Sequence, residues 1–364
     1  MSLTLWPRQV AARAAVLDAL ERGVGRQLVA LPTGVGKSVL AANLAGEFAR
    51  TLFLVHREEL LAQAVATFLR ARPGADVSWI GRGRRCPATS ARFVVAMVQT
   101  ASTLRFREDA FDLIVVDECH HAKSESWSAL IQKFSPRLLL GLSATPFRQD
   151  GRALVPDPFH ALTYEMTTVE AIMEGVLARP RVVQVATAAD LSGVKVVAGE
   201  FAENSLARRV NLRDRNDLVV EAFKREAGDR RALLFSAGVD HAREMARLFT
   251  AAGIRADWVS GEDLEREKKI RAFKAGHLQV LANSHLLTEG YDDPGVSAVI
   301  VARPVRSVGL YAQMIGRGLR QHPGKADCLL LECLDREGGD VRSAAPLVAA
   351  LAEAETSRLV EVPA

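Results

Sequence analysis

The chain alternates short, uniformly apolar runs with segments of helical spacing, and it repeats this order in both halves. A run without polar positions offers no face to solvent, so it fits a strand that helices cover on both sides. Strands of that kind, separated by helices, predict an α/β fold with parallel sheets. The apolar runs span residues 26–32, 51–56, 92–98, 111–118 and 137–145 in the first half, and 231–238, 256–261, 278–284, 297–303 and 327–334 in the second.

Two domains of this kind are expected, because 364 residues are long for a single core. We place the first domain at residues 1–178 and the second at residues 216–340. Residues 179–215 are interpreted as a connector, within a less regular region that begins near residue 147 and holds loops, a helix and a return strand. Residues 341–364 are predicted to form a short helical tail.

Composition narrows the class of protein. Hydrophobic residues make up 49% of the chain and charged residues 25%, both ordinary for a soluble globular protein. No run of 18 apolar residues and no secretory signal is visible, so we expect a cytoplasmic protein without a membrane partner. The net charge of +4 permits a polyanionic partner. Cys86, Cys119, Cys328 and Cys333 form no C-x-x-C pair, which favours a reducing compartment, with the last two as buried thiols, over a zinc site.

The stretch "LPTGVGKS", residues 31–38, follows an apolar run and precedes a helical pattern. It matches a phosphate-binding loop except that Leu31 stands where the general pattern has glycine. Gly34 and Gly36 permit positive φ and a close approach of phosphate to backbone N–H groups. Lys37 is expected to reach the β and γ phosphates of ATP, and Ser38 to bind Mg²⁺. The predicted nucleotide-binding residues of the loop are Thr33, Gly34, Val35, Gly36, Lys37 and Ser38.

An acidic motif lies about 80 residues after the glycine-rich loop, in "DLIVVDECHHA". Four apolar residues, 113–116, place Asp117 at the carboxyl end of a strand, where an α/β sheet binds its ligands. Asp117 is expected to hold Mg²⁺, and Glu118 to polarise the water that attacks ATP. The pairing of this motif with the glycine-rich loop indicates ATP hydrolysis.

With these motifs in this order, the chain resembles the superfamily 2 helicases and translocases of the DExH type, from Gln9 to Arg320. The wording of "DECHHA", "LSATPFR" and "LLTEGYDDPGV" is most similar to compact bacterial RadD-like repair helicases and their XPB-like cousins. The loop of that family carries a small residue in place of the first glycine, so Leu31 is compatible with membership. The resemblance implies two tandem RecA-like domains that bind ATP and Mg²⁺.

Several further residues of the first half acquire roles from this resemblance. Gln9 in "LWPRQ" would read adenine, although relatives often carry R-x-Y-Q where this chain has Trp6 and Arg8. His120 would link the acidic motif to "GLSATPFR". The residues implied to couple ATP to the strand channel here are Ser143 and Thr145, and those implied to contact nucleic acid are Arg57, Gln63, Gln99 and Thr100.

The second half supplies the remaining motifs. In "LLTEGYDDP", the resemblance implies that Thr288 holds backbone phosphate and that Gly290 and Asp292 approach the nucleotide sugar. In "YAQMIGRGLR", helical spacing places three polar residues on one face. Of these, Arg317 and Arg320 are implied to be arginine fingers that stabilise charge on the γ-phosphate, with Gln313 as a coupling residue.

The function implied is an ATP-dependent helicase or translocase that acts in DNA repair or recombination. Single-stranded or forked DNA is the expected partner, RNA remains an alternative, and the expected state is a monomer that works with repair proteins. A motor without strand separation, as in a restriction or remodelling complex, stays open because no wedge hairpin is obvious. A DNA-binding scaffold with a decayed ATP site conflicts with the intact charged motifs, and a P-loop kinase conflicts with the second α/β domain.

Overall fold

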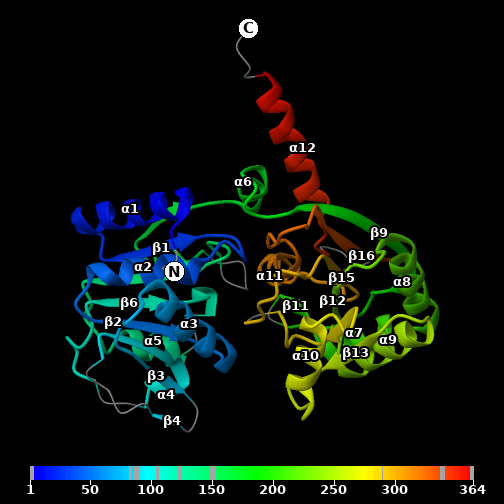
Figure 1. Ribbon diagram of the computed structural model, residues 1–364, viewed down its shortest axis with the longest axis horizontal. Coiled ribbons are helices and arrows are strands. Elements are labelled where there is room, and N and C mark those ends of the chain that lie inside the picture. Colours follow the sequence, from blue (N-terminus) through cyan, green and yellow to red (C-terminus); the bar gives the residue numbers. More distant parts are fainter. Residues whose placement is uncertain are drawn as a thin grey trace. The chain divides into compact units, whose positions relative to one another are not determined.

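The computed structural model describes residues 4–81, 84–85, 91–103, 106–121, 125–147, 153–197, 199–288, 290–336 and 341–360. The chain divides into two compact units, Met1–Thr167 and Thr168–Ala364. Each unit builds its own sheet and its own hydrophobic core, with helices packed on the sheet (Figure 1).

In its described residues, the first unit forms a sheet with the strand order β4-β3-β5-β2-β6-β7-β1-β8. Neighbouring strands run parallel, except that β4 pairs antiparallel with β3. The parallel α/β fold expected for this half is confirmed. The strands are β1 (Arg26–Ala30), β2 (Thr51–Val55), β3 (Val77–Gly81), β4 (Arg84–Arg85), β5 (Phe93–Met97), β6 (Leu113–Val116), β7 (Leu138–Ser143) and β8 (Ala161–Glu165). The helices are α1 (Pro7–Glu21), α2 (Lys37–Leu44), α3 (Glu58–Ala71), α4 (Val98–Ala101) and α5 (Glu125–Ile131), with short 3₁₀ turns η1 (Ala45–Glu47) and η2 (Cys119–His121).

The strand order brings three chemistry-bearing segments to one edge of this sheet. β7 lies between β1 and β6, with Ser143 beside Ala30 and Gly141 beside Val116. All four residues of β6 are buried, as its uninterrupted apolar sequence predicts. Parallel strands end at the same edge, so the loop after β1, the acidic residues after β6 and the end of β7 are neighbours.

The second unit holds a parallel sheet with the strand order β13-β14-β12-β15-β16-β9. A short antiparallel hairpin, β10 with β11, follows β9 along the chain. The strands are β9 (Arg179–Asp190), β10 (Val196–Val197), β11 (Glu200–Phe201), β12 (Ala232–Phe235), β13 (Ala256–Val259), β14 (Val280–Asn283), β15 (Ala298–Val301) and β16 (Asp327–Arg336). The helices are α6 (Thr168–Met173), α7 (Glu203–Val210), α8 (Arg213–Glu226), α9 (Val239–Ala251), α10 (Arg266–Lys274), α11 (Val308–Gly318) and α12 (Ala345–Val360).

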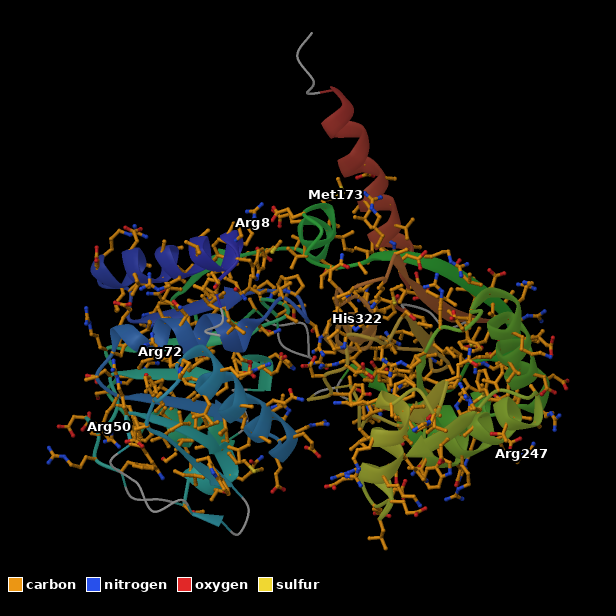
Figure 2. The ribbon with its side chains drawn as sticks, in the orientation of Figure 1. Arg8, Arg50, Arg72, Met173, Arg247 and His322 are labelled. Atoms are coloured by element: carbon orange, nitrogen blue, oxygen red, sulfur yellow. The ribbon has the colours of Figure 1, made fainter. Side chains whose placement is uncertain are left out.

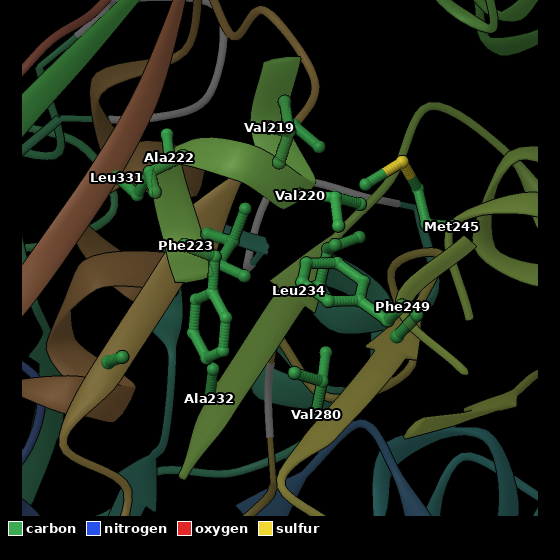
Figure 3. Close-up of a cluster of buried hydrophobic side chains, with 14 of the residues drawn as sticks. Val219, Val220, Ala222, Phe223, Ala232, Leu234, Met245, Phe249, Val280 and Leu331 are labelled. Atoms are coloured by element: carbon green, nitrogen blue, oxygen red, sulfur yellow. The ribbon is translucent and has the colours of Figure 1, made fainter. Parts of the chain in front are cut away.

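The core of the second unit lies between α8, α9 and the strands they cover. Figure 3 shows side chains from these helices, from β12 and from β14 gathered in one apolar cluster. Phe223 of α8 meets Phe249 of α9 edge to face, with ring centroids 5.3 Å apart. The cluster also includes Leu234 of β12, which is fully buried. This core fixes the sheet that carries the later motifs.

The structure divides the chain at a different place from the one we expected. The boundary between the units falls at Thr167 and Thr168, not at residue 178. Residues 179–190, interpreted as connector, form β9 and pair along their length with β16. They are therefore part of the second sheet, whose edge they form. The expected helical tail is present as α12, which packs on α6.

No helix among the described residues is long and apolar enough to span a membrane. The described residues also hold no group of three or more His, Cys, Asp or Glu side chains that could bind a metal ion on their own. Cys119, Cys328 and Cys333 are free, buried thiols. Cys86 lies outside the described residues.

Candidate functional site

The phosphate-binding loop predicted at residues 31–38 connects β1 to α2. Gly34 and Gly36 adopt positive φ, at 97° and 82°, a conformation that residues with side chains rarely take. Gly36 is the N-cap of α2, so the partial positive charge of the helix N-terminus directly follows the turn. Lys37 and Ser38 are the first two residues of that helix. The local geometry is suited to binding an anion.

Gln9 and Trp6 hold this loop through its backbone. Gln9 Nε2 donates to the carbonyl oxygens of Val35 at 3.0 Å and Gly36 at 3.1 Å, and the Trp6 indole N–H donates to Val35 O at 3.2 Å. Gln9 Oε1 in turn accepts the Trp6 backbone N–H at 3.2 Å, which leaves Gln9 only 2% exposed. The structure thus shows Gln9 bound to the loop, and the adenine contact stays a prediction. Trp6, which departs from the family pattern, acts on the loop as well.

Lys37 lies at the centre of the candidate site. Its ammonium group is 3.6 Å from Glu118 Oε1, and it donates to the carbonyl of Leu31 at 3.3 Å. The two side chains are 8% and 9% exposed, so the pair is held largely away from solvent. His120 Nδ1 lies 3.5 Å from the other carboxylate oxygen of Glu118. The first unit thus brings Lys37, Glu118 and His120 together, and the expected contact of His120 with "GLSATPFR" stays a prediction.

The acidic motif takes an unusual backbone conformation. Glu118 has φ of 47°, a left-handed value that costs a non-glycine residue on the order of 1 kcal/mol or more. Asp117 steadies the turn, because its backbone N–H donates to Leu54 O at 3.0 Å and its Oδ1 accepts the Glu118 N–H at 3.1 Å. Burial, with the Glu118 charge as the next cause, raises the pKa of the Cys119 thiol well above its usual value. Strained backbone conformations of this kind concentrate at functional sites. In this conformation the carboxylate of Glu118 lies beside the ammonium group of Lys37.

Ser143 joins the end of β7 to the loop. Its carbonyl accepts the Leu31 N–H at 2.9 Å, and its hydroxyl accepts the Thr145 N–H at 3.3 Å. The Thr145 hydroxyl donates to Phe147 O at 3.3 Å. The segment that we expected to couple ATP to movement is therefore in direct contact with the phosphate-binding loop.

The residues present fit a magnesium–nucleotide complex. Asp117 supplies a buried carboxylate and Ser38 a hydroxyl at the helix start, both oxygen ligands of the kind that Mg²⁺ prefers. Thr33 Oγ1 is buried in the loop and has no hydrogen-bond partner among the described residues. A buried hydroxyl without a partner is rare in folded proteins, so a bound ligand oxygen would satisfy it.

The first set of nucleic-acid candidates lies at the same sheet edge. Arg57 is the N-cap residue of α3, which follows β2, and Gln63 lies within that helix. Gln99 and Thr100 lie in the short α4, directly after β5. β2 and β5 are paired neighbours, so Arg57, Gln99 and Thr100 come from adjacent strand ends, while Gln63 lies further along α3.

The second unit places its two candidate arginines on the backbone of the "GYDDP" loop. Arg317 is 5% exposed, and it donates from Nε to Thr288 O at 2.9 Å and from Nη1 to Tyr291 O at 2.8 Å. Arg320 donates to the same Tyr291 carbonyl at 3.1 Å and forms an ion pair with Asp292. Burial lowers the pKa of the Arg320 guanidinium. Asp292, expected near a nucleotide sugar, is bound to Arg320 in this structure.

The helix that carries these residues ends earlier than its pattern predicts. α11 stops at Gly318, so Gln313 and Arg317 lie on it while Arg320 lies beyond it and forms a bridge with Leu177. The shared helical face that we expected for all three is therefore wrong for Arg320. A Cβ at position 318 would lie 2.5 Å from Cys328 Sγ and 2.6 Å from a Val299 methyl group, so close packing on the sheet requires this glycine.

The remaining second-unit candidates keep backbone or buried roles. Gly290 has φ of 72°, which favours glycine. Thr288 is 2% exposed, and its Oγ1 has no hydrogen-bond partner among the described residues. Gln313 is buried within α11.

Sequence reasoning missed Arg72, which supports the far end of the loop helix. Its guanidinium donates to the carbonyls of Ala42 at 2.9 Å and Asn43 at 2.8 Å, at the C-terminal end of α2 (Figure 2). A Cβ on Gly46 would lie 1.6 Å from Arg72 Nη2, so a side chain at position 46 would displace the guanidinium from this place. A cation at a helix C-terminus is favourable, but Arg72 lies 30 residues after Ala42, so no local sequence pattern indicates this contact.

Two family models match the chain in the order of the two units. The model described as "Type III restriction enzyme, res subunit" matches residues 2–148, and "Helicase conserved C-terminal domain" matches residues 214–322. "Putative ATP-dependent helicase IRC3" of Saccharomyces cerevisiae is 32% identical, with 92% of this chain and 52% of that relative covered. "DNA 3'-5' translocase XPB2" of Sulfurisphaera tokodaii is 26% identical, with 87% of this chain and 79% of that protein covered.

The fold agrees with these matches. A fragment of an HsdR subunit of a type I restriction enzyme from Vibrio vulnificus superposes with a TM-score of 0.70 at 24% identity, over 89% of this chain and 63% of that one. The chain is therefore similar, in both of its units, to superfamily 2 helicases, a class of ATP-hydrolysing enzymes. Within that class it is similar to the IRC3 helicases and to subunits of type I restriction enzymes. It spans about half the length of the first curated relatives that it matches.

Proposed function

We propose that this protein is a nucleic-acid-stimulated ATPase that uses ATP hydrolysis to move along a DNA strand. The observation that carries the proposal is the buried constellation of Lys37, Glu118 and Asp117 beside a loop of anion-binding geometry. Two sheets of the same type, each with charged residues near the carboxyl ends of its strands, support a motor with two working parts.

The first unit supplies the hydrolytic groups in this proposal. Lys37 binds the β and γ phosphates, and Ser38 and Asp117 hold the magnesium ion, which neutralises phosphate charge when it is bound. Glu118 then orients and polarises the attacking water. Its Oε1 lies 3.6 Å from the Lys37 ammonium group, so the two opposite charges attract each other within the site.

The second unit supplies the arginine pair. We propose that Arg317 and Arg320 stabilise the charge that develops on the γ-phosphate during hydrolysis. Both guanidinium groups already share one acceptor, Tyr291 O, so their positions are linked. The ion pair of Arg320 with the partly exposed Asp292 would have to exchange for phosphate.

The nucleic-acid contacts are expected to be made to the backbone. Arg57, Gln63, Gln99 and Thr100 in the first unit and Thr288 in the second are the candidates. Contacts to phosphate carry no sequence information, so binding should depend little on sequence, and it should weaken with salt in proportion to the number of phosphates that cationic side chains such as Arg57 neutralise. The assignments of a monomeric state, of DNA rather than RNA, and of a role in repair rest on the resemblance to RadD-like and XPB-like helicases.

A second candidate is a motor that moves along duplex DNA without separating its strands. The similarity to relatives named as type I restriction enzyme subunits favours this alternative. Strand displacement from a forked duplex distinguishes the two: a helicase releases the displaced strand, whereas a translocase hydrolyses ATP on the same substrate without releasing it.

The site assignment is tested by Lys37→Ala and Glu118→Gln. Lys37→Ala should lose ATP binding, while Glu118→Gln should keep binding and lose turnover by about 10²- to 10⁴-fold. Turnover is measured with single-stranded DNA, duplex DNA, forked DNA and RNA in parallel. The exposed residues Lys133 and Glu21 provide the controls Lys133→Ala and Glu21→Gln, which should behave as the unmodified protein. Unchanged turnover in Glu118→Gln would refute the site, and absence of stimulation by every nucleic acid would refute the motor.

A further inference from the structure

Lys325 lies in a tight turn just after the arginine pair. The turn spans His322 to Lys325, with Pro323 and Gly324 at its centre, and the Lys325 N–H donates to His322 O at 3.0 Å. Gly324 has φ of 81°, the value that the third residue of a type II turn requires. Figure 2 marks His322, where the turn begins. The turn sends the chain back toward the end of α11 before β16 starts.

The Lys325 ammonium group is surrounded by backbone carbonyls. It donates to Val296 O at 2.6 Å, to Arg320 O at 2.8 Å and to Gly318 O. Among the described residues it has no carboxylate within ion-pair distance. Three N–H bonds therefore meet three carbonyl oxygens, which fills the donor capacity of an ammonium group. Burial is the main cause that lowers the pKa of this lysine.

The three carbonyls belong to two segments that hold the arginines. Gly318 ends α11, and Arg320 is the second arginine itself. Val296 lies at the end of the 290–296 loop, whose Tyr291 carbonyl accepts hydrogen bonds from both arginines. Lys325 thus ties the exit of the helix to the loop on which the guanidinium groups rest.

A helix-capping role explains only part of this arrangement. Gly318 O is a terminal helix carbonyl, and a lysine often satisfies such a group. The bond to Val296 O contributes nothing to capping, because Val296 belongs to another segment. That other segment is anchored separately by Asp293, which accepts from Arg231 at 2.8 and 3.0 Å and from Tyr291 OH at 3.1 Å. Lys325 joins this anchored loop to the backbone of Arg320, in addition to the contacts that the Arg320 side chain makes with Tyr291 and Asp292.

We propose that Lys325 is a positioning residue for the arginine pair, and that it sets where the guanidinium of Arg320 lies by binding both segments at once. This inference rests on the proposed role of Arg317 and Arg320 in hydrolysis. It makes the turn after α11 a part of the hydrolytic machinery, although Lys325 itself touches no substrate.

The test is Lys325→Met, which keeps the apolar stem and removes the three N–H donors. We expect kcat for ATP to fall between about tenfold and about a hundredfold, the range that follows from a misplaced catalytic group, while KM for ATP changes less than about threefold. Lys325→Arg keeps the charge, but a planar guanidinium cannot converge on three carbonyls, so it should restore little of kcat. Lys268→Met, at an exposed surface lysine, is the matched control and should leave kcat unchanged.

A double-mutant cycle separates positioning from a general structural effect. If Lys325 acts through Arg320, Lys325→Met should lower kcat little further in an Arg320→Ala background. Equal fold losses in both backgrounds would overturn the proposal, as would a Lys325→Met variant with full kcat. An unmodified protein without ATPase activity would instead refute the proposed function. A protein in which Arg320→Ala lowers kcat but Lys325→Met does not would refute this inference alone.

Discussion

The contacts of Gln9 with the phosphate-binding loop predict a specific penalty for Gly36→Ala. A Cβ at position 36 would lie 2.6 Å from Gln9 Nε2, which is too close for any real side chain. Position 36 also has φ of 82°. The left-handed backbone costs alanine about 1–2 kcal/mol. Displacement of the Gln9 amide from two carbonyls costs about 1 kcal/mol for each hydrogen bond, so the free energy of unfolding should fall by about 3–4 kcal/mol in total.

Gly23→Ala is a matched control for this substitution. Gly23 has φ of 87°, yet a Cβ there would meet nothing within 4 Å. It therefore carries the backbone cost without the clash, and the difference of about 2 kcal/mol between the two variants isolates the contact with Gln9. In a Gln9→Ala background the obstacle is gone, so Gly36→Ala should then cost no more than Gly23→Ala.

Urea unfolding followed by tryptophan fluorescence measures these differences. Trp6, Trp79 and Trp127 belong to the first unit and Trp258 to the second, so the signal is weighted toward the unit that carries the substitutions. Binding of a fluorescent ATP analogue gives a second readout, in which displacement of Gln9 from the loop should lower the affinity of Gly36→Ala more than that of Gly23→Ala. Equal costs for Gly36→Ala and Gly23→Ala, or no relief in the Gln9→Ala background, would refute the reasoning.

Three further substitutions or conditions test the second unit, each by urea unfolding. Arg215→Met should destabilise by about 3–5 kcal/mol, because it leaves the carboxylate of Asp335 buried without the guanidinium that now binds it at 2.7 and 2.9 Å; Arg215→Met with Asp335→Leu should recover most of the loss. Burial lowers the pKa of His241 to about 3, so the folded protein keeps it neutral while the unfolded chain protonates it near 6.5. Above about pH 6.5 His241 is neutral in both states and causes no change in the free energy of unfolding with pH. As the pH falls from there toward 3, that free energy should decrease by up to about 1.4 kcal/mol per pH unit, and the decrease should be shallower in His241→Asn. Gly318→Ala should cost about 1–3 kcal/mol despite its better helix propensity, because its Cβ would overlap Cys328 and Val299; an unchanged midpoint would show that the sheet yields there.

The sequence predicted those parts of the site that depend on local pattern. Asp117 could be placed at a strand end because the apolar run before it is uninterrupted, and β6 is buried throughout. Gly34 and Gly36 could be placed in a loop because strand and helix patterns flank them. In both cases a single stretch of chain carries enough information to fix the conformation.

Long-range pairings were beyond such reasoning. Residues 179–190 alternate buried and exposed positions in their second half, which is typical of an edge strand, but only pairing with β16 reveals the sheet to which they belong. The end of α11 at Gly318 depends on carbonyl contacts from Lys325 and on packing against Val299, and neither is visible in the helical pattern. Every residue has a backbone carbonyl, so the residue type does not show whether a distant side chain binds there.

The contacts of Gln9 illustrate how such an invisible pairing acts on the site. A trans peptide points its carbonyl and the following N–H in opposite directions. Gln9 and Trp6 bind the carbonyls of Val35 and Gly36, so the N–H groups of Gly36 and Lys37 point away from them. Those N–H groups are the ones that an anion at the start of α2 would use. The N-terminal segment therefore orients the phosphate-binding face of the loop from behind, and this mechanical role is independent of any contact between Gln9 and adenine.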